Sequence, residues 1–227
     1  MLVISSTGFA IGLDLTMIIY TLWVISLSRR NGRMPCAMGL GLLTWLAMLH
    51  LGLSTEKLFP ADISGVMFLI VVFLAVGLVG VILFLIRPLR EQLLALDQQQ
   101  LLLLQGIRVL FGANFLMSAS LGNLPTTFGI MDGWTHIAAG FFGLIAAFAL
   151  ARGTQGERRA WFANLFGLAD ILIVASTLSL VLLPTITPYH PMMYAVFLPA
   201  PLWLWFHLIS IWKLMGKTVV TTVGAQA

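Results

Sequence analysis

Two ionisable residues of opposite charge stand inside segments that are otherwise apolar enough to cross a membrane. Arg108 lies within the stretch from Gln105 to Pro125, and Asp170 lies in a later apolar stretch. A charge in the hydrocarbon costs at least about 3 kcal/mol unless it is paired. At 1.5 Å per helical residue, Arg108 stands roughly 12 Å and Asp170 roughly 15 Å from the same end of their spans. The matching depth predicts a buried ion pair, which either locks two helices together or marks a path for an ion or substrate.

Three further polar residues are predicted to join this pair. Gln105 precedes Arg108 by about one helical turn on the same face, and Asn164 lies near the inner end of the span that holds Asp170. His207 falls in the inner third of the last apolar segment, where a histidine more often packs through a hydrogen bond than binds a ligand or carries a proton. Together these residues form a candidate buried ion pair or ligand site: Arg108, Asp170, Gln105, Asn164, His207.

A second group gathers near the opposite, outer ends of the spans. Asp14, His50 and His136 fall in one outer layer, and His190 lies in a loop above it. Imidazoles and a carboxylate are ligands for a divalent metal, and two histidines are axial ligands for a haem. No recognised metal or haem spacing such as H-x-x-x-H or C-x-x-C-H is present, and no catalytic motif occurs. The alternative is a set of independent interfacial histidines, with Asp14 near the lipid headgroups.

The high hydrophobic content of the chain indicates that membrane-spanning helices carry these residues. Of the 227 residues, 60% are hydrophobic and 9% are charged, whereas about a quarter of the residues in soluble proteins are charged. A transmembrane helix needs about 20 apolar residues. The chain is therefore predicted to be all-α, an integral membrane bundle of seven transmembrane helices in a single domain over residues 1–227. The expected spans are residues 8–27, 35–53, 63–86, 101–122, 133–150, 161–183 and 192–214.

Three local patterns refine this arrangement. Residues 89–100 place leucines at helical spacing opposite charges, which indicates an amphipathic interfacial turn or an extension of the fourth helix. Pro199 and Pro201 are expected to kink or split the seventh span because proline lacks a backbone N–H. Small residues recur every four positions in the fifth span and predict a closely packed helix, on whose inner face His136 also lies: Ala139, Gly143, Ala147, Ala151.

Basic residues are distributed unevenly between the loops. Lys57 is the only Lys or Arg in the loops after the second, fourth and sixth spans, and all other basic clusters fall on the opposite side. The positive-inside rule then predicts an outside N-terminus and a cytoplasmic C-terminus. The net charge of +4 is thus explained by topology, and no nucleic-acid partner is expected. The basic residues on the predicted cytoplasmic side are Arg29, Arg30, Arg33, Arg87, Arg90, Arg152, Arg158, Arg159, Lys213 and Lys217.

The fourth to sixth spans resemble an uncharacterised family of bacterial multi-pass membrane proteins. The residues that carry the resemblance are Gln105-x-x-Arg108, Gly122-x-Leu-Pro125, Phe128, Gly133, Gly140 and Asn164-x-x-Gly167-x-x-Asp170. The resemblance extends from Gln105 to Asp170 and over the segment from Pro199 to His207. In that family an aspartate often follows a glycine where this chain has Thr135 and His136. The resemblance groups Arg108 with Asp170 and implies a multi-pass protein of the bacterial inner membrane. It implies no activity.

The buried polar set and the interrupted seventh span favour a non-catalytic membrane protein. One form binds or transports a small molecule and has a polar cavity that reaches Arg108. The other form is an accessory subunit of a membrane complex or a homo-oligomer, with a broad apolar face for a partner. The alternative class is a metal- or haem-dependent membrane enzyme that uses His50, His136 and Asp14. Apart from the lipid bilayer, the sequence identifies no partner.

Overall fold

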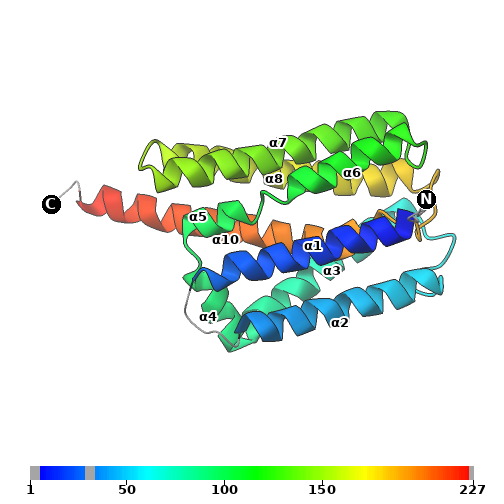
Figure 1. Ribbon diagram of the computed structural model, residues 1–227, viewed down its shortest axis with the longest axis horizontal. Coiled ribbons are helices and arrows are strands. Elements are labelled where there is room, and N and C mark those ends of the chain that lie inside the picture. Colours follow the sequence, from blue (N-terminus) through cyan, green and yellow to red (C-terminus); the bar gives the residue numbers. More distant parts are fainter. Residues whose placement is uncertain (1–5, 29–33, 225–227) are drawn as a thin grey trace. The chain divides into compact units, whose positions relative to one another are not determined.

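The computed structural model describes residues 6–28 and 34–224, with the side chains of the last helix described up to residue 216. Most of these residues are helical and none forms a strand, and seven segments are long and apolar enough to cross a membrane. Figure 1 follows the helices along the chain. In order they are α1 (Ser6–Ser26), α2 (Met34–Ser54), α3 (Gly65–Leu85), α4 (Arg87–Ala95), α5 (Gln98–Leu103), α6 (Arg108–Ser120), α7 (Thr126–Ala151), α8 (Gly156–Thr177), the π-helical turn η1 (Leu178–Leu182), α9 (Met193–Phe197) and α10 (Pro199–Gly224).

The helices divide into two compact units that alternate along the chain. Unit 1 consists of Met1–Ala95 and Ile171–Leu202, and unit 2 consists of Leu96–Asp170 and Trp203–Ala227. Unit 1 therefore holds α1 to α4, the end of α8, η1, α9 and the start of α10. Unit 2 holds α5 to α7 and most of α8 and α10. Of the basic residues that predict the orientation, Arg29, Arg30 and Arg33 lie outside the described residues.

In unit 1, the prolines of the last span interrupt the helix at Leu198, between α9 and α10. In a regular helix the carbonyl of Phe197 would accept from the backbone N–H of residue 201, which is a proline and has none. The indole Nε1 of Trp45 donates to that carbonyl instead, at 2.9 Å. A side chain from α2 thus satisfies the backbone group that Pro201 leaves unpaired, as a membrane segment requires.

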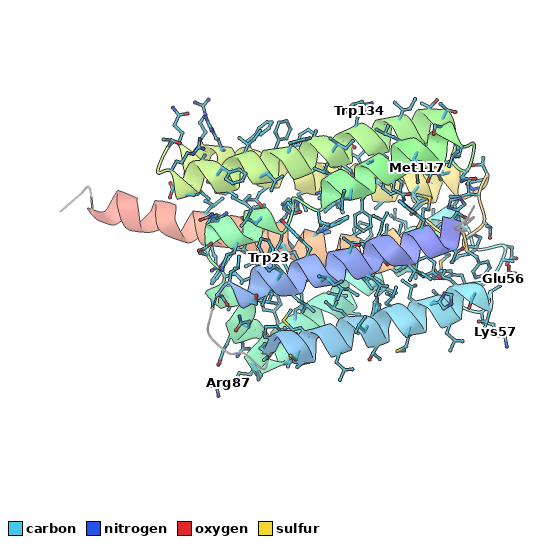
Figure 2. The ribbon with its side chains drawn as sticks, in the orientation of Figure 1. Trp23, Glu56, Lys57, Arg87, Met117 and Trp134 are labelled. Carbon is cyan, nitrogen blue, oxygen red and sulfur yellow. The ribbon has the colours of Figure 1, made fainter. Side chains whose placement is uncertain are left out.

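Large apolar side chains remain exposed on many helices, as expected for a surface in contact with lipid. In both α2 and α3, only 22% of the most hydrophobic window is buried, against 61% for the last span. Trp134 and Met117, labelled in Figure 2, are 60% and 40% exposed. These surfaces can be stable in a bilayer or against another apolar protein surface, but not in water.

In unit 2, α6 and α7 pack through glycines. A Cβ atom at Gly112 would lie 2.8 Å from the backbone nitrogen of Ile137, and one at Gly140 would lie 2.9 Å from that of Val109. Only glycine lets the two helix backbones approach this closely. Of the small residues that predict a packed fifth span, Ala139, Gly143 and Ala147 are buried and Ala151 is exposed.

The helix α7 begins at Thr126, earlier than the start near Gly133 that the sequence suggests. Two threonines, an aspartate and two glycines make residues 126–133 resemble a loop. However, Gly129 and Gly133 are packing positions, since Cβ atoms there would collide with Ala119 and Leu116 of α6. Tertiary packing therefore outweighs the low helix propensity of this segment.

The fourth predicted span consists of two helices, α5 and α6, separated by residues 104–107. Backbone bonds in this turn join residues three apart, from Gln105 to Leu102 at 3.1 Å and from Gly106 to Leu103 at 2.8 Å, so the helix tightens before Arg108. The amphipathic segment upstream forms a separate helix, α4. It ends before Asp97, which caps α5 in a reciprocal capping box with Gln100.

Candidate functional site

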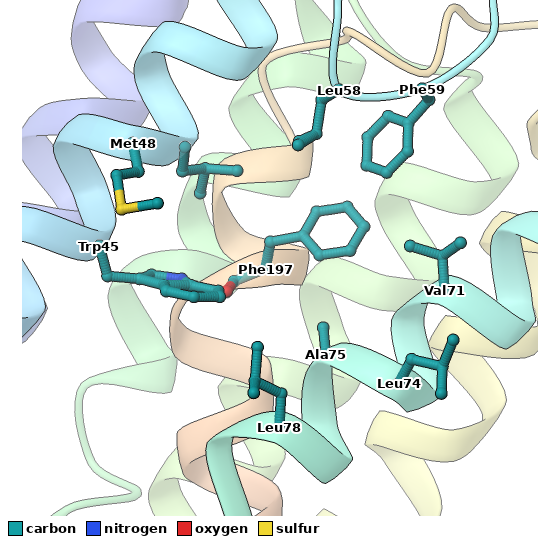
Figure 3. Close-up of a pocket in the computed structure, with 10 residues that line it drawn as sticks. Trp45, Met48, Leu58, Phe59, Val71, Leu74, Ala75, Leu78 and Phe197 are labelled. Carbon is teal, nitrogen blue, oxygen red and sulfur yellow. The ribbon is translucent and has the colours of Figure 1, made fainter. Parts of the chain in front are cut away.

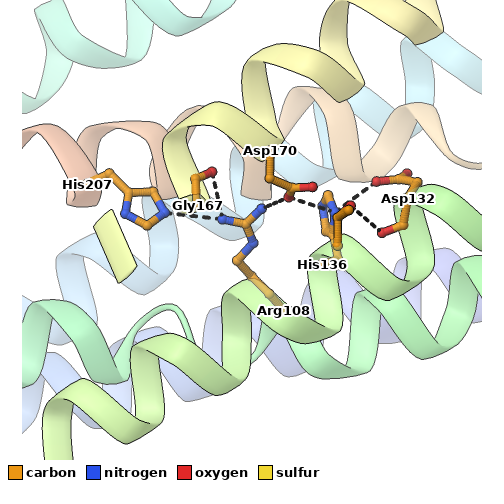
Figure 4. A network of polar contacts seen from close by, with 7 residues as sticks. Arg108, Asp132, His136, Gly167, Asp170 and His207 are labelled. Carbon is orange, nitrogen blue, oxygen red and sulfur yellow. Dashed lines mark hydrogen bonds and ion pairs between the residues drawn. The ribbon is translucent and has the colours of Figure 1, made fainter. Parts of the chain in front are cut away.

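Arg108 is the first residue of α6 and is completely buried in unit 2. Its guanidinium donates from one terminal nitrogen to Oδ2 of Asp170. The other terminal nitrogen lies 3.2 Å from the carbonyl of Gly167 and 3.2 Å from Nε2 of His207 (Figure 4). The structure thus brings Arg108, Asp170 and His207 into contact, and Asn164, a fourth of the five residues expected at the buried pair, contacts His207.

Gly167 makes room for this cluster. A Cβ atom there would overlap the imidazole of His207 and lie 3.1 Å from a guanidinium nitrogen of Arg108. Trp203 forms the apolar wall, with the guanidinium carbon of Arg108 5.3 Å from its ring centroid. That distance is within the range of a cation–π interaction, which strengthens where water is excluded.

His207 connects the arginine to a set of uncharged polar side chains. Its Nδ1 lies 3.0 Å from Oδ1 of Asn164, and the Asn164 amide donates to Oγ of Ser210 at 2.7 Å. Ser210 also accepts a hydrogen bond from the amide of Gln98. A neutral His207 with its proton on Nδ1 satisfies both neighbours, because Nδ1 then donates to Asn164 while Nε2 accepts from Arg108.

On the other side of Asp170, the network continues into α7. Nδ1 of His136 lies 3.0 Å from Oδ2 of Asp170 and 2.9 Å from Oδ1 of Asp132. Asp132 is completely buried, and His136 and Asp170 are each 5% exposed. Asp132 is not among the site residues predicted from the sequence, because it precedes the expected start of the fifth span. Its position one turn before His136 is the signal that could have identified it.

These side chains form a continuous chain of polar contacts within unit 2, which we call the polar row. Successive members are in contact, all are buried, and they come from α5, α6, α7, α8 and α10. Its members, in order of contact, are Gln98, Ser210, Asn164, His207, Arg108, Asp170, His136 and Asp132. Gln105 is not a member. It lies in the turn between α5 and α6, and its Cβ packs against Gly143, where a Cβ atom would be only 2.9 Å away. Its side-chain amide has no hydrogen-bond partner among the described residues.

Two of the three predicted metal or haem ligands lie in unit 1. His50 contacts the hydroxyl of Tyr194 through Nδ1 at 2.6 Å. Asp14 is completely buried in α1, and within the described residues neither of its carboxylate oxygens has a hydrogen-bond partner. His136 belongs to unit 2. A shared site of Asp14, His50 and His136 therefore remains a prediction.

Unit 1 also contains an apolar pocket of about 450 Å³. Figure 3 shows it between α2, α3 and the segment around Phe197, with Trp45, Met48, Phe59 and Leu74 among its lining side chains. None of the site residues expected from the sequence lines it. The polar cavity expected to reach Arg108 remains a prediction.

A scan of protein-family models matched residues 63–215 to a domain of unknown function, DUF8737. The matched region contains every residue on which the resemblance to an uncharacterised family rested, and also the whole polar row. Comparisons with curated proteins and with solved structures found no match. Because the family model covers more than half of the chain, the protein belongs to the DUF8737 family.

Proposed function

We propose that the protein is a multi-pass protein of the bacterial inner membrane that binds or transports a small polar solute or ion along the polar row. The observation that carries this proposal is the continuity of the row through the helices of unit 2. A structural lock between helices needs a single ion pair, whereas this unit buries three charged side chains, two histidines and three uncharged polar residues in one line. Polar groups in a membrane are costly and are typical of solute paths.

The interruption of the fourth span gives further support. Transporters place their binding sites where membrane helices are discontinuous, because the helix ends and unwound turns offer polar groups to a solute. In this chain α6 begins at Arg108, directly after the turn at residues 104–107. The central charge of the polar row therefore stands at a helix discontinuity.

Labelling of engineered cysteines tests for a solute path. The chain has a single cysteine, so Cys36→Ser provides a background without thiols. In that background we expect Asn164→Cys and Ser210→Cys to react with a water-soluble, charged methanethiosulfonate reagent. A path that opens to water, even briefly, exposes these thiols and lets them ionise, and the thiolate is the reactive form.

Leu165→Cys is the matched control, because it is adjacent to Asn164 on α8 but 54% exposed on the apolar surface. A thiol in lipid stays protonated and should react many times more slowly. If Asn164→Cys and Ser210→Cys are as unreactive as Leu165→Cys in folded, reconstituted protein, the row is a dry structural network and the transport proposal is wrong.

For the topology, we propose an outside N-terminus and a cytoplasmic C-terminus, supported by the asymmetry of basic residues and the odd number of candidate spans. Cys36 is exposed near the start of α2, at the end that this topology places in the cytoplasm. A membrane-impermeant maleimide should therefore label Cys36 only after spheroplasts are permeabilised. Labelling of Cys36 in intact spheroplasts would reverse the proposed orientation.

An accessory subunit is the second candidate, favoured by the low burial of α2 and α3. Such a subunit should co-purify with a partner chain or as a homo-oligomer in mild detergent, and a stable solitary monomer would argue against it.

A further inference from the structure

At one end of the polar row, three metal-binding side chains converge. His136 and Asp132 lie one turn apart on α7, and Asp170 faces them from α8 (Figure 4). One ligand atom from each lies within 4.8 Å of the others. The three residues are buried, so water is largely excluded from their carboxylate and imidazole groups.

Protein hydrogen bonds do not satisfy the carboxylates of this cluster. Nδ1 of His136 can carry only one proton, so it can donate to only one of the two carboxylates it approaches. In the described part of the chain, Oδ2 of Asp132 and Oδ1 of Asp170 have no hydrogen-bond partner, whereas Oδ1 of Asp132 and Oδ2 of Asp170 lie 2.9 and 3.0 Å from Nδ1 of His136. The hydroxyl of Thr135 donates instead to the main-chain carbonyl of Asp132, at 3.2 Å. Buried carboxylate oxygens without partners are costly, and a bound cation would satisfy them.

The charge balance also leaves room for a cation. Two carboxylates, those of Asp132 and Asp170, face one guanidinium, that of Arg108, and the imidazole of His136. A metal binds only neutral imidazole, and with His136 neutral the cluster carries one excess negative charge. Arg108 contacts Oδ2 of Asp170 and leaves Oδ1 available. A cation on Oδ1 would therefore not displace Arg108, which would hold the carboxylate in place as a positioning residue.

The donor atoms select the kind of cation, and their spacing allows one ion to reach all three residues. Ligands at right angles about 2.1 Å from an ion are separated by about 3.0 Å. The distance from Nδ1 of His136 to Oδ1 of Asp132, 2.9 Å, is close to this separation. The 3.0 Å contact of Nδ1 with Asp170 is to Oδ2, which Arg108 also contacts. One imidazole and two carboxylates form a mixed nitrogen and oxygen set that suits Zn²⁺, Mn²⁺ or Fe²⁺ better than Na⁺ or Mg²⁺, which prefer oxygen alone.

We infer that Asp132, His136 and Asp170 bind a divalent transition-metal ion. This metal ion would be the class of solute that binds at one end of the polar row. Its role as a solute rests on the proposed function. Three protein ligands leave further coordination positions open, as at sites where water or substrate exchanges.

Titration with Co²⁺ alone, a coloured substitute for Zn²⁺, tests the site in purified full-length protein after chelator treatment. The wild-type protein should bind one Co²⁺ per chain and develop visible absorption bands, which Zn²⁺ should remove by competition. Asp132→Asn and His136→Gln should each weaken binding at least tenfold, since losing even an outer-shell partner costs about 10- to 100-fold in affinity.

The matched controls are Asp14→Asn and His50→Gln, which replace a buried carboxylate and an imidazole of unit 1. Both should bind Co²⁺ with the affinity of the wild type. The inference is overturned if the wild type binds neither Co²⁺ nor Zn²⁺, or if the two control variants lose binding and Asp132→Asn retains it. In the latter case the ligand set expected from the sequence would be correct.

X-ray absorption of the Zn²⁺-loaded wild type provides a test that does not require any variant to fold. One imidazole in a shell otherwise made of oxygens is expected, and two or more imidazoles would overturn the ligand assignment. The outcome is separate from the cysteine labelling. If the protein binds metal but the engineered cysteines stay unreactive, the transport proposal is wrong and the metal site stands. If the cysteines react but no metal binds, the metal site is wrong and the transport proposal stands.

Discussion

Arg108→Ala and Asp170→Ala, made singly, should each lower the free energy of unfolding by about 3–5 kcal/mol, the range for breaking a buried ion pair. Arg108 is completely buried and Asp170 is 5% exposed, so each change leaves the opposite charge without its partner and without access to water. Removing Arg108 also leaves the carbonyl of Gly167 and Nε2 of His207 without their donor. Steric trapping of unfolding in bicelles would measure the loss.

The pair of Arg87 and Glu91 on α4 offers a matched control. It is also an arginine–carboxylate pair, at 2.7 Å, but its side chains are 79% and 58% exposed. Exposed ion pairs are screened by water and contribute little. Arg87→Ala should therefore leave stability unchanged within error, and an equally small loss for Arg108→Ala would show that the buried pair is not formed.

Gly112→Ala should cost about 3 kcal/mol, the upper end of the range for overpacked cores. The added methyl group would meet the carbonyl of Gly133 and the backbone nitrogen of Ile137, and backbone atoms cannot rotate away as a side chain can. The helices α6 and α7 would have to move apart. Because Arg108 lies on α6 and His136 lies on α7, the polar contacts that each makes would lengthen or break. The same unfolding measurement, combined with loss of Co²⁺ binding, would detect this.

Gly77→Ala is the matched control for this substitution. Gly77 also lies inside a membrane-length helix, α3, but no atom lies within 4 Å of a Cβ built there. Alanine should stabilise this helix by up to about 1 kcal/mol through its higher helix propensity. If the two glycine variants behaved alike, the close approach of α6 and α7 would not exist.

The sequence was sufficient for the all-helical fold and its seven candidate spans, because hydrophobicity over about 20 residues is a strong signal. It also pointed to Arg108, Asp170 and His207, since a charged or ionisable side chain in an apolar segment must find a partner at its own depth. The structure places these three residues in contact.

Other features depend on tertiary contacts that leave little trace in the sequence. Asp132 was missed because α7 starts earlier than its polar and glycine residues suggest, and these glycines are packing positions against α6. The break before Arg108 was missed because an apolar run containing Gln105 and Gly106 is compatible with a continuous helix. The grouping of His136 with His50 and Asp14 rests on depth along the spans alone and remains a prediction, since His136 belongs to unit 2 and the other two residues to unit 1.

The most direct test of the central claim, that the buried charges of unit 2 form one connected network, is a double-mutant cycle on Arg108 and Asp170. Unfolding free energies would be measured by steric trapping for the wild type, Arg108→Ala, Asp170→Ala and the double variant. We expect the double variant to lose about 1–3 kcal/mol less than the sum of the single losses, because removing both charges leaves neither unpaired. Losses that add to within about 0.5 kcal/mol would mean that the two residues do not interact, and would contradict the network.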